Sequence, residues 1–222
     1  MLFAGGAAGL ASLVGALPFT ALPLTASPLA AASVGDVTFR ASWDGKPVGE
    51  HRVAFRTDGE RVTVDTHVDI TVKALVFTVF RLRHFAREVW RAGRLESLTS
   101  ETEQDDERWL VSGEAVESGF RIVGEDGPYL AAPHLLTTNS LWDSRIVREV
   151  KLIDVQHGGE VGLVARPLGI ERVATPRGEL RAARYQIITP HYAGSVFFDD
   201  HQRWVKALVE LKGEILDYDL LS

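Results

Sequence analysis

The feature that most limits how this chain can fold is a strict alternation of side chains over residues 62–72. Apolar residues and one threonine occupy the even positions from Val62 to Val72, and polar residues occupy the odd positions from Arg61 to Lys73. A period of two residues is typical of a β-strand with one buried face. These eleven residues at roughly 3.3 Å each span about 36 Å, far more than the usual strand. Strands of this length are typical of strongly bent sheets that curl around a core.

Similar alternation predicts strands along most of the chain after residue 36, and Asp-Gly dipeptides at 44–45 and 58–59 predict tight turns. Residues 74–80 are apolar at consecutive positions, so either both faces are covered there or a bulge exchanges the faces. Residues 204–211 also fit a helical face, but a strand is favoured because alternate residues are apolar. Further strands are predicted at residues 37–43, 51–55, 82–90, 94–100, 109–112, 120–123, 161–165, 169–173, 180–189, 194–198 and 215–220.

One short helix is predicted near the middle of the chain. Ser140 and Asp143 have the spacing of a capping box, in which a hydroxyl caps the helix and a carboxylate follows three residues later. Trp142, Ile146 and Val150 then recur every four residues, which is helical spacing.

The fold class follows from these elements. We predict an all-β protein built on a single, strongly curved antiparallel sheet that closes towards a half-barrel or barrel, with one short helix. No linker or change of composition interrupts the chain after residue 35, so residues 33–222 are predicted to form one domain. A chain of this length can bury a sizeable core.

Residues 1–32 are predicted to be a signal peptide. No charged side chain precedes Asp36, and the small residues Ala30 and Ala32 fit the rule for cleavage near Ala32/Ser33. The basic opening of a typical signal peptide is missing, and an uncleaved membrane anchor is the alternative. We therefore expect a periplasmic or secreted protein that contacts a membrane only through this segment, if it is not cleaved.

Composition excludes several classes of function. The 222 residues include no cysteine, which excludes thiolate zinc sites, iron–sulfur clusters and lipid-modified cysteines. The net charge of −6 argues against a nucleic-acid partner, which would require a basic face. We predict no cofactor.

Five segments, taken in order, carry a family resemblance. They are Trp-Asp-Gly-Lys-Pro-Val-Gly-Glu-His-Arg-Val (43–53), Glu-Val-Trp-Arg-Ala-Gly-Arg-Leu (88–95), Thr-Thr-Asn-Ser-Leu-Trp (137–142), Phe-Asp-Asp-His-Gln-Arg-Trp-Val (198–205) and Ile-Leu-Asp-Tyr-Asp-Leu (215–220). Together they resemble a family of exported bacterial proteins known as domain of unknown function 6134, over about residues 36–221. The resemblance implies a curved β half-barrel of the bacterial envelope, similar in outline to the periplasmic carriers of lipoproteins. No catalytic residues are attached to that family, so the resemblance implies none here.

The familiar catalytic and metal motifs are missing from the sequence. It contains no Gly-x-Ser-x-Gly, no phosphate-binding loop and no dinucleotide-binding fingerprint. No two of the seven histidines stand at i, i+2 or i, i+4, so a local zinc motif is missing as well. We therefore predict no catalytic residue and no metal site.

Three polar sets have a functional and a structural interpretation. Asp65, His67 and Asp69 share one strand face and would bind a metal only with ligands from a neighbouring strand, so a solvated outer face is favoured. His84 and Glu88 share a face and would form an acid–base pair only if strand curvature brought them together, so a structural role is favoured. The acidic residues 101–107 lack the calcium-loop spacing and are predicted to be a solvated loop.

The aromatic residues are the best candidates for a binding site. They either fill the core or line a groove on the concave face of the sheet that takes an acyl chain or an extended peptide. The candidate ligand-binding residues are Phe77, Phe80, Trp90, Trp142 and Trp204.

Three hypotheses of function follow. The first is a non-enzymatic envelope protein that binds a lipid-like ligand, an extended ligand or a partner protein, and it is favoured because the chain has an export segment, many aromatics and no catalytic motif. The second is a structural or assembly module that binds by edge-strand addition. The third is a hydrolase or isomerase with dispersed histidines and carboxylates, for which His67, His84 or Glu88 would have to converge in one pocket.

Overall fold

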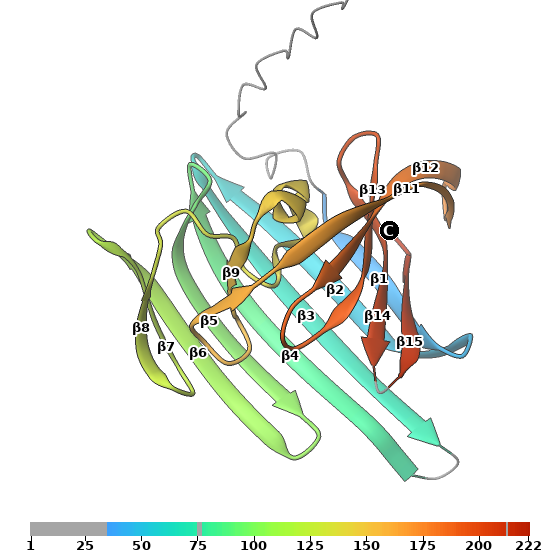
Figure 1. Ribbon diagram of the computed structural model, residues 1–222, viewed down its shortest axis with the longest axis horizontal. Helices are drawn as coiled ribbons and strands as arrows, with labels where there is room; N and C mark the ends of the chain where they lie inside the picture. Colours follow the sequence, from blue (N-terminus) through green and yellow to red (C-terminus); the bar gives the residue numbers. More distant parts are fainter. Residues whose placement is uncertain (1–34, 75–76, 212) are drawn as a thin grey trace, which may run out of the picture.

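The computed structural model describes residues 35–74, 77–211 and 213–222, so the predicted signal peptide lies outside the described residues. Within them the all-β prediction is confirmed, because thirteen strands form one antiparallel sheet and two short strands form a second (Figure 1). The two strands at the ends of the large sheet, β8 and β11, do not pair with each other. The sheet is therefore an open, curved half-barrel.

The large sheet consists of two meanders joined side by side. The first runs from β1 to β8 and the second from β11 to β15, and β1 pairs antiparallel with β15, with Phe39 opposite Leu220. The first meander comprises β1 (Val37–Trp43), β2 (Lys46–Asp58), β3 (Arg61–Ala74), β4 (Phe77–Arg91), β5 (Arg94–Gln104), β6 (Glu107–Val116), β7 (Gly119–Gly124) and β8 (Gly127–Ala131). The second comprises β11 (Val164–Thr175), β12 (Gly178–Ile188), β13 (Ala193–Asp199), β14 (Trp204–Leu211) and β15 (Glu214–Leu220).

The connection between the meanders, residues 132–163, crosses the inner face of the sheet. It leads from β8 at one edge of the sheet to β11 at the other. Its buried Leu136, Ile146 and Leu152 belong to the same hydrophobic core as the inward side chains of the sheet. Figure 1 shows this segment, in yellow, lying over the long strands. It contains η2 (Ser140–Trp142), η3 (Ser144–Arg148), β9 (Lys151–Ile153) and β10 (Glu160–Gly162).

Strand β3 confirms the alternation that defined the fold. Val62, Val64 and Ile70 are buried, whereas His67 and Asp69 on the opposite face are exposed. Burying an apolar side chain contributes about 1.5–3 kcal/mol relative to leaving it exposed, so a slip of one residue would forfeit this face.

The predicted single α-helix is replaced by two short 3-10 helices. Ser140 lies inside η2 and its hydroxyl bonds to the Thr137 hydroxyl at 3.0 Å, so it does not cap a helix. Asp143 instead caps η3 by accepting a hydrogen bond from the Arg145 amide. Val150 is exposed, so the four-residue spacing ends at Ile146. Local hydroxyl bonds compete with helix formation in this segment. Neither short helix in the described chain has the length and apolar character needed to cross a membrane.

The acidic segment 101–107 is not the loop that its composition predicted. Strand β5 continues to Gln104, and only the turn before β6 is irregular. Thr102 points inward and is buried, while Glu101 pairs with Arg108 across the strands. The alternation of buried and exposed residues was hard to recognise here because the outward residues are glutamates, which pair with arginines on neighbouring strands.

Two other open points are settled by the strand pairing. Residues 204–211 form strand β14, as favoured. The register of β3 with β4 shifts between Val72 and Lys73, so the irregularity expected at residues 74–80 includes a bulge.

Candidate functional site

The predicted ligand-binding residues are brought together only in part. Phe80, Trp90, Trp142 and Trp204 are all buried in one hydrophobic cluster. The rings of Trp90 and Trp142 meet edge to face, 5.9 Å apart. Phe77 opens strand β4, opposite Ala74, and its side chain lies outside the described part of the structure.

Trp90 has a clear structural role, because it holds a buried carboxyl group. Its indole N–H donates to Glu88 Oε2 at 2.9 Å, and the Thr137 hydroxyl donates to Glu88 Oε1 at 2.7 Å. Burial raises the pKa of Glu88 to about 7, although these two hydrogen bonds oppose the shift. The three residues tie the crossing segment to strand β4.

His84 does not pair with Glu88. Its Nδ1 bonds to the Thr102 hydroxyl at 2.8 Å, and its Nε2 lies 2.9 Å from the amide nitrogen of Asn139, which is a donor. Burial lowers the pKa of His84 to about 4, so the ring is neutral near pH 7. His67 is exposed on the outer face, and the three residues required by the hydrolase hypothesis therefore do not converge.

The outer-face set around His67 belongs to an ion-pair network. Asp65 accepts a hydrogen bond from Arg87 Nε at 2.7 Å and a second one from Arg56. Asp69 lies 3.9 Å from Arg83. These carboxylates therefore have arginine partners, as expected for a solvated sheet face.

An apolar cavity of about 250 Å³ lies beside Trp142 and Trp204. The Trp204 ring packs 4.1 Å from Phe39 and its N–H donates to the Lys206 carbonyl, so this wall is fixed. The Trp142 indole N–H, by contrast, is buried without a hydrogen-bond partner among the described residues. The remaining apolar lining comes from Val37, Leu180, Val205, Leu220 and Leu221, and charged residues at the cavity are Asp36, Arg177, Glu179 and Arg203.

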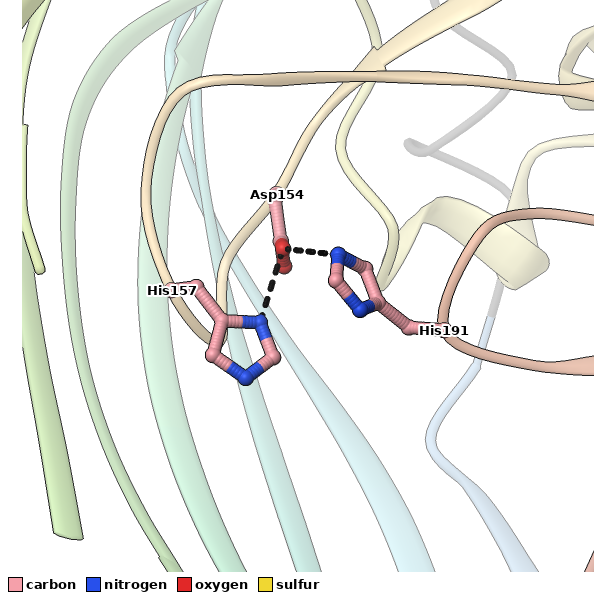
Figure 2. A group of neighbouring side chains, drawn as sticks. All are labelled: Asp154, His157 and His191. Atoms are coloured by element: carbon pink, nitrogen blue, oxygen red, sulfur yellow. Dashed lines mark hydrogen bonds and ion pairs between the residues drawn. The ribbon is translucent and has the colours of Figure 1, made fainter. Parts of the chain in front are cut away.

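A second cluster, which we call the Asp154 cluster, consists of Asp154, His157 and His191. His157 Nδ1 lies 3.0 Å and His191 Nε2 lies 3.4 Å from the same carboxylate oxygen, Oδ2. Figure 2 shows the two imidazole rings reaching this carboxylate from different loops. Asp154 is only 3% exposed.

Two tight turns position the Asp154 cluster. Asp154 opens the turn between β9 and β10, where its Oδ1 accepts a hydrogen bond from the Gln156 amide at 2.9 Å. Gly158 adopts a φ of +90° in that turn, which glycine tolerates best. His191 lies in the turn between β12 and β13, where the Thr189 hydroxyl accepts its backbone N–H.

One weak signal for the Asp154 cluster is present in the sequence. Asp154 and His157 stand three residues apart before a Gly-Gly turn, but this spacing has many structural uses. Asp154 and His157 lie in the connection between the meanders, whereas His191 belongs to the second meander, so only the fold brings it to the carboxylate.

A smaller cavity of about 130 Å³ adjoins the Asp154 cluster. Asp154, His191, His84 and Asn139 contribute to its wall, together with Tyr192. The Tyr192 hydroxyl is buried and has no hydrogen-bond partner among the described residues. The wall of this cavity thus includes Asp154 and His191 of the cluster and Tyr192, whose hydroxyl has no partner in the described chain.

Comparison with known proteins places this open half-barrel among beta-barrel-like domains. The chain belongs to the family described as Domain of unknown function (DUF6134), whose profile matches residues 39–221. Its fold is similar to the crystal structure of a beta-barrel-like protein of domain of unknown function DUF1849 from Brucella abortus, with a TM-score of 0.60. That alignment covers 84% of this chain and 95% of the other at 7% identity, so it shows the fold alone. No curated protein matches the chain.

Proposed function

We propose that this protein is an exported, non-enzymatic envelope protein that binds an acyl-like ligand in the apolar cavity beside Trp142 and Trp204. The observation that carries the proposal is that Trp142 lines an apolar cavity while its buried indole N–H has no hydrogen-bond partner among the described residues. A buried donor without an acceptor costs about 1–3 kcal/mol, which a ligand oxygen would recover. An acyl group offers both an apolar chain and such an oxygen.

The size and charge of the cavity narrow the ligand class. Small-molecule pockets usually measure about 300–1,000 Å³, so a cavity of about 250 Å³ suits one short chain or the end of a longer one. Arg177 lines the cavity and forms no ion pair with another described residue, so its guanidinium is available for a carboxylate. The export segment predicted at residues 1–32 supports an envelope location.

The first test is native mass spectrometry of the mature protein, purified gently from its own envelope fraction, followed by lipid extraction. We expect an acyl compound in stoichiometric amount. An apo protein that also fails to bind dodecanoate in solution would overturn the proposal.

Binding of dodecanoate then tests the role of Trp142. The variant Trp142→Phe keeps an aromatic ring but removes the N–H, and loss of one hydrogen bond should weaken binding about tenfold. Trp43→Phe is the matched control, because Trp43 lies at the other end of β1 from Val37 and does not line the cavity. Equal losses in both variants would contradict the proposed contact.

Edge-strand addition stays a second candidate because of strand β11. It is an edge strand whose exposed apolar residues include Val164, Leu168 and Ile170. Its register with β12 shifts between Pro167 and Gly169, which interrupts the edge. Cross-linking in the envelope tests this candidate: a partner captured through β11 should be lost in Ile170→Lys, and an unchanged pattern would exclude β11 as the docking edge.

A further inference from the structure

We propose that the Asp154 cluster is a binding site for one divalent transition-metal ion of the zinc type. The three ligand atoms, Asp154 Oδ2, His157 Nδ1 and His191 Nε2, lie within 4.8 Å of one another (Figure 2). Imidazole and carboxylate are ligands that zinc uses in proteins. This proposal is independent of the acyl-binding cavity.

The distances are close to those of a metal site. Zinc bonds of about 2.0–2.2 Å in tetrahedral directions place neighbouring ligand atoms about 3.3–3.5 Å apart. The two nitrogen–oxygen separations in the cluster are 3.0 and 3.4 Å. An ion therefore fits after small rotations that bring the two histidine nitrogens closer together.

The charge of the cluster also favours a cation. Asp154 is buried, and its ion-pair partners among the described residues are only His157 and His191. No described lysine or arginine compensates this carboxylate. A buried carboxylate needs a positive partner or several hydrogen bonds, and a metal ion between it and two neutral imidazoles supplies the charge.

The surroundings hold the ligands in place. The second oxygen of Asp154 accepts the Gln156 amide, so the carboxylate has a fixed orientation. The His157 ring meets Trp109 of β6 edge to face, with 4.8 Å between centroids. These contacts come from a turn and from strand β6, which the fold already fixes, and this reduces the cost of ordering a metal site.

The adjoining cavity provides for a fourth ligand. Three protein ligands leave a coordination position, which in open zinc sites is taken by water or by an anionic group. Asp154 and His191 both line the 130 Å³ cavity, and so does Tyr192 with its unpartnered hydroxyl. A metal-bound water or small anion in this cavity would accept the hydrogen bond that Tyr192 otherwise lacks.

The test is titration of the chelator-treated, full-length mature protein with zinc and with cobalt. We expect one zinc ion per chain by calorimetry and the visible absorption of cobalt held by nitrogen and oxygen ligands. His191→Gln should weaken zinc binding about 100-fold, because loss of a ligand costs at least as much as loss of a supporting partner. His191 is 46% exposed, so its replacement should leave the fold intact, which circular dichroism checks.

His201→Gln is the matched control, because His201 is exposed and lies outside the cluster. It should bind zinc like the wild type. No stoichiometric binding by the wild type, or equal affinity in His191→Gln, would overturn the proposal and leave the cluster as a hydrogen-bond network. Should His191→Gln unfold, His157→Gln provides the same comparison.

Discussion

The variant Glu88→Gln should be less stable than the wild type at low pH and more stable than the wild type at high pH. Glu88 is fully buried between Trp90 and Thr137, and burial raises its pKa from 4.5 to about 7. The native state therefore holds this proton to higher pH than the unfolded chain does. Ionisation of Glu88 costs nothing below pH 4.5, reduces the free energy of unfolding as pH rises towards 7, and reaches its full cost above pH 7.

The magnitude follows from the same shift. A difference of about 2.5 pKa units corresponds to about 3 kcal/mol, since one unit is worth about 1.4 kcal/mol. Glutamine keeps the shape but replaces the O–H of the protonated acid by a bulkier NH₂ group beside Thr137 and Trp90, at a constant cost of about 1 kcal/mol. Glu88→Gln should thus be less stable than the wild type by about 1 kcal/mol at pH 4.5 and more stable by about 2 kcal/mol at pH 8.

Guanidinium unfolding at a series of pH values from 4.5 to 8 measures this difference. Titration of the buried histidines cancels, because both proteins contain them. Glu96→Gln is a useful control, since a hydrogen bond from Arg61 lowers the pKa of Glu96 below 4.5; Glu96 is therefore ionised over nearly all of this range, and its replacement should change stability by nearly the same amount at every pH. A difference between wild type and Glu88→Gln that stays constant over this range would refute the reasoning.

Three further predictions concern stability. Burial lowers the pKa of His51 to about 3, so the wild type loses stability as pH falls from 6.5 towards 3. His51→Phe removes this loss and should lower the pH at the midpoint of acid unfolding, which tryptophan fluorescence measures. Gly158→Ala should lower the free energy of unfolding in denaturant by about 1–3 kcal/mol, because residue 158 has a φ of +90° and the added Cβ would lie 2.8 Å from the Cα atom of Gly124 in β7. Lys206 donates hydrogen bonds to Asp217 and Asp219, so Lys206→Met should cost about 1 kcal/mol, and less in high salt; a loss that does not depend on salt would argue against this ion pair.

The strands could be predicted wherever one face is buried and the other solvated. Val62 to Val72 is the clearest case, because the period of two reads directly as inward and outward positions. The continuation of the predicted strand 94–100 through Thr102 escaped prediction, since the outward Glu101 pairs with an arginine on the neighbouring strand and so reads as part of an acidic loop. Charge pairing between strands is not visible in one segment alone.

The candidate sites show the same limit. Trp142 and Trp204 were singled out from the sequence, and the fold places both at one cavity. The Asp154 cluster was not, because His191 reaches Asp154 only through the pairing of the second meander. The 3-10 turns were also missed, since the hydroxyl of Thr137 bonds to Glu88 of a distant strand, and no spacing within the segment reveals this.

The pairing of β1 with β15 has a consequence for the order of folding. Most strands pair with a neighbour in sequence and close only a short loop. The pairing of Phe39 with Leu220, by contrast, closes a loop that contains nearly all of the described chain. We expect the two meanders to nucleate separately and this junction to form last. Until β15 pairs with it, the seven-residue strand β1 has one unpaired edge. A newly made molecule can therefore pair with other chains at a strand that lies inside the sheet, away from both edges, once folding is complete.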